Sequence, residues 1–376
     1  MIVLAMATAL VQPASTPGPV DRVAEAELAA LDTRGLEQFL QSLDAEVRPY
    51  LPEFRPTVTR GAGLDPAVFG KQLLVKLARE LALNAHLLGE LVLLAVVCVL
   101  LAHLGGAFAA QNVSQLAFYV CYLVMMGLAA NSFFTTVKLG RAAVGDMVGL
   151  MYALLPMVCS LMAAVGATAT SALLNPAVLG AVAAISRIVQ EIIFPLAILM
   201  AIVTLVGHLS EGFSLSKLAG LLRDLTVGAT GVLLAGFVGL LVIKGVTAAA
   251  ADGVGLRTAK YVSGTFVPIV GKGMSDAMET VAGCSLVLKN AVGGFGAWAL
   301  VALTAFPLVK ILAVVAIYRL AAALVQPLGE TRLVEALNAF GNCFTVLFAV
   351  TALIGLAFFL GLTILVALGN YAYVLR

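Results

Sequence analysis

Residues 339–369 read AFGNCFTVLFAVTALIGLAFFLGLTILVALG, a stretch that contains no charged side chain. Because a transmembrane helix needs about 20 mainly apolar residues, this stretch is long enough to cross a bilayer, even if it is tilted or broken. Comparable stretches occur at roughly 87–104, 113–131, 147–169, 188–208, 227–250, 291–306 and 308–326. The last two could instead form one long helix kinked at Pro307. The sequence therefore predicts an all-α, polytopic membrane helix bundle of about seven to eight spans.

The composition points to the same class of protein. Of the 376 residues, 62% are hydrophobic and 11% are charged, and the mean hydropathy is +1.07. Soluble globular proteins carry about 25% charged residues, so an ordinary cytosolic enzyme and a disordered protein are both excluded. The net charge of +2 is small, and the basic residues form no stripe. Nucleic acid is therefore not expected as a partner.

The charged residues divide the chain into regions. Residues 13–86 hold 18 of the 42 charged side chains. We interpret 15–86 as a small water-facing helical region and 87–376 as the polytopic membrane domain. A short apolar run at residues 2–11 precedes Gln12 and Pro13. Its length suits the core of a signal peptide rather than a span, although a basic n-region is missing. Residues 1–14 are thus expected to be an export signal or a hydrophobic leader, which would place 15–86 outside the cytoplasm.

The 15–86 region is predicted to contain amphipathic helices. Leucine, phenylalanine and valine residues recur near a 3.6-residue period between Leu28 and Val47, which is typical of a helix with one buried face. Asp65 and Pro66 have the order of an N-cap followed by an N1 proline. The region is either a hairpin lying on the membrane surface or a docking surface for a partner.

The sequence lacks two common catalytic motifs. The chain has no GxxxxGK[ST] loop and no HExxH, so neither nucleotide hydrolysis through a P-loop nor metalloprotease activity is expected. We predict no enzyme, no cofactor and no metal site. The five cysteines occur singly in or beside apolar runs and are expected to be small buried hydrophobes: Cys98, Cys121, Cys159, Cys284 and Cys343.

Charged residues within the apolar stretches are functional candidates. Arg187 and Glu191 are four residues apart and either pair along one helix face or lie at the membrane interface. Lys310 and Arg319 face different ways, and each either lines a wet cavity or extends its charge to the interface. Glycines at short intervals are expected to let helices pack closely: Gly145, Gly149, Gly228, Gly231, Gly236 and Gly239.

The segment 257–290 combines polar, glycine and proline residues within a mainly apolar chain. An amphipathic helix is predicted from Met274 onward, after the sequence FVPIVG. We interpret the segment as a re-entrant or interfacial element, which is a usual place for a pathway or gate; the alternative is a helix that braces the bundle. The candidate pathway or gate residues are Lys260, Pro268, Gly271, Lys272, Asp276, Glu279, Thr280 and Asn290.

This segment also carries a resemblance. Residues 257–293, RTAKYVSGTFVPIVGKGMSDAMETVAGCSLVLKNAVG, resemble the signature of the stage III sporulation protein AE family. Residues 210–225, SEGFSLSKLAGLLRDL, are similar to the stretch that precedes it in the family. The layout of a leader, a short helical region and a polytopic body also agrees. The resemblance covers the chain from about residue 30 to its end.

The resemblance implies a place in the channel complex that connects mother cell and forespore in endospore-forming bacteria. It implies as partners the other stage III sporulation A-operon proteins, including a separate ATPase and ring-forming proteins, and indirectly stage II sporulation protein Q. The implied location is the mother-cell-derived outer forespore membrane, where the chain would sustain late forespore gene expression. A homo-oligomer in membrane lipid is expected. The alternative functions are a self-contained secondary transporter or permease and a membrane scaffold that assembles ring proteins.

Overall fold

The computed structural model describes residues 32–43, 46–51, 53–60, 66–107, 111–209, 215–266 and 271–374. All regular structure in these ranges is helical, as predicted. The elements are α3 (Arg34–Ser42), η1 (Arg48–Tyr50), α4 (Phe54–Arg60), α5 (Pro66–Leu83), α6 (Ala85–Ala107), α7 (Gln111–Ala164), α8 (Thr168–Ile188), the π-helix η2 (Val189–Ile193), α9 (Phe194–Leu209), α10 (Ser216–Phe266), α11 (Gly271–Val325), η3 (Gln326–Leu328) and α12 (Thr331–Val374).

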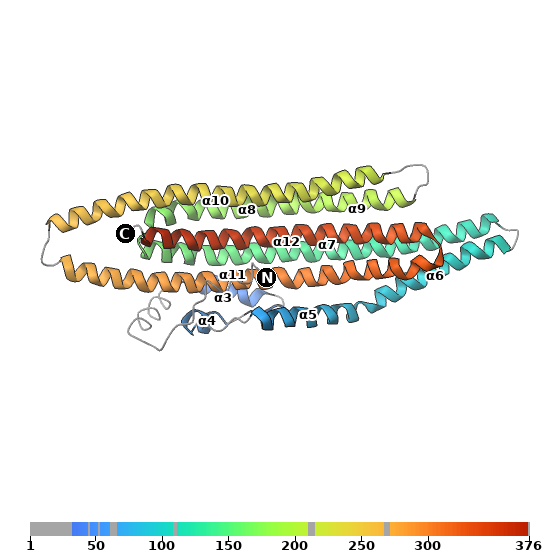
Figure 1. Ribbon diagram of the computed structural model, residues 1–376, viewed down its shortest axis with the longest axis horizontal. Helices are drawn as coiled ribbons and strands as arrows, with labels where there is room; N and C mark the ends of the chain where they lie inside the picture. The colour runs from blue at the N-terminus through green and yellow to red at the C-terminus, as the bar shows by residue number, and fades with distance from the viewer. Residues whose placement is uncertain are drawn as a thin grey trace.

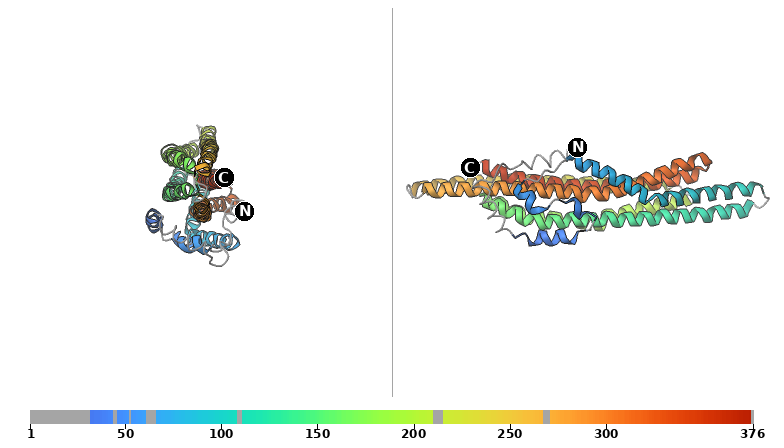
Figure 2. Two further views of the ribbon diagram at one scale, coloured as in Figure 1. Left: turned by 90° about the vertical axis from the view of Figure 1, so that its left-hand side faces the viewer. Right: turned by 90° about the horizontal axis from the view of Figure 1, so that it is seen from below.

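The long helices run side by side as an elongated bundle (Figure 1). α11 and α12 lie against each other along most of their length, and α7 packs against both. The continuous rod formed by α8, η2 and α9 runs back along α7, and α10 packs on α8, α9 and α12. Seen end-on, α3 and α5 lie along one side of the rods (Figure 2). The N-terminal region is thus placed against the bundle rather than beyond its end.

The helices are fewer and longer than the predicted spans. Segments 113–131 and 147–169 fall largely on α7, and 291–306 and 308–326 both fall on α11, which continues through Pro307. The residues between the first two segments include polar and charged side chains but no proline, so the helix is not interrupted. Among the described residues, five helices are long and apolar enough to cross a membrane, or six if the pair α5–α6, bent by 42°, counts as one.

These helices exceed the thickness of one bilayer. α7 has 54 residues, which corresponds to about 80 Å at 1.5 Å per residue. The hydrocarbon core is about 30 Å thick. Steep tilt does not account for a difference of this size, so parts of the long helices extend beyond the hydrocarbon region.

A local change of helix type marks the middle of the α8–η2–α9 rod. Pro195 lacks an N–H group and crowds the carbonyl of the residue four positions earlier, and the π-helix Val189–Ile193 directly precedes it. Such a bulge redirects backbone carbonyls. The carbonyl of Gln190 accepts a hydrogen bond from Arg141 Nη2 at 3.3 Å, and Gln190 Nε2 donates to Arg141 O at 3.1 Å. This exchange ties the rod to the middle of α7.

The start of α8 is stabilised from another helix. The backbone N–H groups of Ala169 and Thr170 donate to Asp252 Oδ1 and Oδ2 at 2.7 and 3.0 Å. Asp252 lies on α10 and is 4% exposed. Its carboxylate therefore satisfies two N–H groups that every helix N-terminus leaves without an intrahelical partner. It also holds α10 against the start of α8, well before α10 ends at Phe266.

Glycine allows the closest helix contacts, but mostly at positions other than those predicted. A Cβ at Gly293 would lie 2.4 Å from Val366, one at Gly296 would lie 2.5 Å from Leu154, and one at Gly355 would lie 2.4 Å from Thr304. Two of these contacts join α11 to α12. Of the predicted glycines, Gly149 approaches Phe39 of α3, whereas Gly145, Gly228, Gly231, Gly236 and Gly239 have nothing within 4 Å. These five glycines do not mark close packing within the described part of the chain.

The α11–α12 contact gives a stability prediction. Gly355→Ala places a methyl group against the β-branched side chain of Thr304 and is expected to destabilise the protein by about 1–3 kcal/mol. Gly236→Ala, on the open face of α10, is expected to be neutral or to stabilise by up to about 1 kcal/mol through helix propensity. Thermal unfolding of both variants in the same detergent tests the difference. Equal unfolding temperatures would show that α11 and α12 do not pack this closely.

Candidate functional site

The N-terminal region docks on α11 through aromatic side chains. The rings of Tyr50 and Phe306 have centroids 4.5 Å apart, those of Phe54 and Phe295 are 5.1 Å apart, and those of Phe69 and Trp298 are 4.9 Å apart. Aromatic pairs at these separations contribute beyond their buried area. The described helices of this region turn apolar residues such as Leu36, Phe54 and Phe69 toward the bundle, where they are buried.

A cluster of three charged residues, Glu46, Lys76 and Lys310, lies beside these rings. Lys310 Nζ is 2.6 Å from Glu46 Oε2, and Lys76 Nζ is 3.6 Å from the same oxygen. Lys76 Nζ also lies 4.6 Å from the centroid of the Phe306 ring, a cation–π contact. The hydrogen bond from Lys310 and the two positive charges hold the pKa of Glu46 below its usual range. The side chain of Lys310 therefore binds the N-terminal region.

The charged cluster makes docking depend on pH. A lowered carboxyl pKa stabilises the docked state above the ordinary glutamate pKa of about 4.3, and this stabilisation is lost as the pH falls through the lowered pKa. Trp298 is the single tryptophan of the chain and contacts Phe69, so its fluorescence reports docking. Acidification is expected to shift Trp298 emission to longer wavelength.

Two variants separate Glu46 from the other carboxyl groups. Glu46→Gln is expected to show the shifted emission already at neutral pH and a smaller further change on acidification. Glu53→Gln removes a neighbouring exposed carboxylate and is expected to behave as the unmodified protein. An identical acid transition in Glu46→Gln and the unmodified protein would show that Glu46 does not hold the region in place.

Lys289 is a buried charge that the sequence analysis did not select. Its side chain is fully buried, and Nζ donates to Val366 O at 2.8 Å and to Asn370 Oδ1 at 2.6 Å. A Cβ on Gly369 would lie 2.5 Å from this nitrogen, so glycine makes room for the ammonium group. Both acceptors lie near the C-terminal end of α12, where the helix dipole favours a cation. The signal available in the sequence was a lysine between the apolar run 286–288 and the predicted span 291–306, followed by Asn290.

The predicted 257–290 element consists of the end of α10 and the start of α11. Helix α10 runs to Phe266 and α11 begins at Gly271, so the helix predicted from Met274 is the first part of α11. These two ends project beyond the other helices (Figure 1). Pro268 and the side chains of Lys260, Lys272, Asp276, Glu279 and Thr280 lie outside the described residues, whereas Gly271 is the first residue of α11. Asn290, next to Lys289, has a buried Oδ1 without a hydrogen-bond partner.

The other predicted charges lie on the outside of the bundle. Arg187 Nε pairs with Glu191 Oε2 at 3.1 Å, and the two side chains are 78% and 61% exposed. Of the two alternatives, the structure has the pair along one helix face, and the pair faces away from the core. Arg319 is exposed, and its stem packs over Gly341. Arg141 was not selected from the sequence; its guanidinium lies 5.6 Å from the Phe194 ring centroid, and its Nε is buried without a partner.

Four of the five cysteines are buried, as expected, and Cys121 is half-buried. The buried ones are Cys98, Cys159, Cys284 and Cys343.

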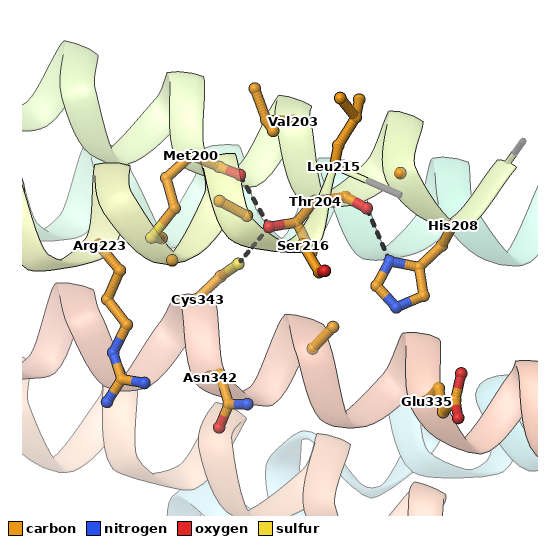
Figure 3. A pocket seen from close by; sticks show the side chains of 14 residues that line it. Met200, Val203, Thr204, His208, Leu215, Ser216, Arg223, Glu335, Asn342 and Cys343 are labelled. Carbon is orange, nitrogen blue, oxygen red and sulfur yellow. Dashed lines mark hydrogen bonds between the residues drawn. The ribbon is translucent and has the colours of Figure 1, made fainter. Parts of the chain in front are cut away.

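A polar groove of about 550 Å³ opens between α9, α10 and α12 (Figure 3). Its polar lining residues include Thr204, His208, Ser216, Arg223, Glu335 and Asn342. In the described part of the chain, no group of three or more His, Cys, Asp or Glu residues is arranged to hold a metal ion.

The fold and these contacts define a polytopic helical membrane protein with an N-terminal region docked along its side. Comparison with known proteins identifies the family. Residues 55–369 match the family described as stage III sporulation protein AE. The chain is 34% identical over 361 residues to the stage III sporulation protein AE of Bacillus subtilis (strain 168). The matched region covers 95% of this chain and 90% of the Bacillus protein. The chain therefore belongs to the stage III sporulation protein AE family and has a role in sporulation. No solved structure matches it.

The contacts of Lys289 give a second stability prediction. Lys289→Met replaces a buried ammonium by an apolar group of similar length, and because desolvating a charge is costly, the unfolding temperature is expected to stay the same or rise. Asn370→Leu keeps the charge and removes one of its acceptors, and is expected to cost about 1–3 kcal/mol. Thermal unfolding of the two variants measures this contrast. A large loss of stability in Lys289→Met alone would contradict it.

Proposed function

We propose that the protein is a transmembrane component of the channel that links mother cell and forespore, in the mother-cell-derived outer forespore membrane. Membership of the sporulation family over nearly the whole chain carries the proposal. A bundle of helices long enough to cross a membrane supports it. Energy for transport comes from a separate ATPase of the same operon, and ring-forming proteins, indirectly with stage II sporulation protein Q, complete the passage between the two membranes.

The conduit is proposed to lie between copies of the chain. Large side chains from three helices fill the centre of the bundle: Leu154 on α7, Phe295 and Leu303 on α11, and Phe344 and Phe358 on α12 are each at most 2% exposed. A packed core of this kind leaves no passage along these helices. The polar residues of 257–290, at the projecting ends of α10 and α11, are the proposed lining of the conduit.

The packed core bears on the two alternative functions. A secondary transporter places its substrate and ion site near the middle of the membrane, inside the protein. The only ion pair within the predicted spans for which the structure describes both partners, Arg187 with Glu191, is exposed instead. This observation disfavours a self-contained transporter. The same packed core also suits a scaffold that assembles ring proteins and conducts nothing, which remains the second candidate.

Sporulation assays separate the channel from the scaffold. In the spore-forming host, a deletion of the gene is complemented with Lys272→Ala or Asp276→Ala, and heat-resistant spores and a late forespore reporter are counted. A conduit lined by 257–290 predicts that both variants reach the membrane at normal levels yet reduce reporter expression and spore yield. Normal yields from both variants, together with loss of assembly in variants of the N-terminal region, would favour the scaffold.

A further inference from the structure

The groove between α9, α10 and α12 contains two opposite charges that do not pair with each other. Arg223, on the second turn of α10, reaches toward α12, and Glu335 lies on the first turns of α12 (Figure 3). Both side chains are exposed and both line the groove. Among the described residues, no carboxylate forms an ion pair with Arg223. Asn342 lies on the Arg223 side of the groove, and Glu335 lies two helical turns before Asn342 on α12 (Figure 3). The groove therefore offers a cation and an anion at different levels.

Hydrogen-bonding groups line the groove between the two charges (Figure 3). Asn342 lies on α12, and Ser216 is the first residue of α10, whose N-terminus carries the positive end of the helix dipole. His208 Nδ1 lies 2.7 Å from Thr204 O, an acceptor that fixes the hydrogen on Nδ1, so Nε2 of the neutral ring is an acceptor on the Glu335 side of the groove (Figure 3). Arg223 and Asn342 thus offer donors suited to a phosphate group, and Glu335 and His208 offer acceptors suited to an ammonium group.

The groove lies where charged helix turns meet apolar ones. On α12 the last charged side chain before Val374 is Glu335, and on α10 residues 225–243 carry no charge. From Ile192 in η2 to Gly207 on α9 the residues are likewise uncharged. The lining of the groove is itself partly apolar and includes Met200 and Val203 on α9 and Leu215 just before α10. This level has the chemistry of the boundary between headgroups and acyl chains.

We propose that this groove binds the headgroup of a zwitterionic phospholipid with a primary amine, of the phosphatidylethanolamine type. Arg223, assisted by Asn342, binds the phosphate, and Glu335 binds the ammonium group. The acyl chains lie along the uncharged turns of α9, α10 and α12 that follow the groove. The site would hold α9, α10 and α12 together at the membrane surface. It is separate from the proposed conduit at 257–290.

Lipid retention by the purified full-length protein tests the proposal. Native mass spectrometry compares phosphatidylethanolamine, phosphatidylglycerol and soluble glycerophosphoethanolamine at equal concentration. We expect phosphatidylethanolamine to be retained best, and the soluble headgroup not to bind, because it lacks acyl chains to cover the apolar flank. Tighter binding of phosphatidylglycerol, or equal binding of the soluble headgroup, would overturn the assignment.

Three variants locate the bound lipid. Arg223→Gln is expected to weaken retention of both phospholipids by about tenfold or more. Glu335→Gln is expected to remove the preference for phosphatidylethanolamine and to strengthen phosphatidylglycerol binding, a gain that misfolding does not produce. Lys217→Gln removes a cation on the same helix that does not line the groove, and is expected to bind as the unmodified protein does. Unchanged retention in Arg223→Gln would place the lipid elsewhere.

Discussion

Close contact between α11 and α12 sets the positions of the other features described. Glycines at 293 and 355 let the two helices approach until side chains of the partner helix fill the space of a Cβ. Across the same contact Lys289 donates to the carbonyl of Val366 and to the amide oxygen of Asn370. The other faces of α11 present Trp298 and Lys310 to the N-terminal region. In a membrane, where the hydrophobic effect does not drive helices together, such small residues supply the van der Waals contact that does.

The sequence predicted the class of fold and the amphipathic N-terminal region, because apolar runs and a 3.6-residue period are local patterns. It did not predict where the helices end, since the polar residues between two apolar runs of α7 resemble a loop but do not break a helix. The glycines that matter were missed for a related reason: spacing shows that glycines share a face, as at 228 and 236, but not whether another helix lies against that face. Lys289 was missed because its acceptors lie on α12, far away in the chain.

Charged residues that lie in or beside the apolar stretches of the sequence have different roles in the structure. Lys310 pairs with Glu46, Lys289 is buried beside neutral acceptors, and Arg187 pairs with Glu191 on the outer surface. Periodicity alone does not distinguish these outcomes, because each depends on a partner from another element. The packed centre of the bundle, the polar ends of α10 and α11 and the sporulation family together favour a component that forms a passage only with further copies.

Single-particle imaging of the purified protein in lipid nanodiscs tests this account most directly. The account predicts a closed assembly of several copies around an opening, with the 257–290 segments facing that opening. Within each copy, α11 and α12 would be in contact through Gly293 and Gly355, with the N-terminal region against Trp298. Single copies with a continuous water-filled passage between α7, α11 and α12 would contradict it, because the conduit would then lie within one chain.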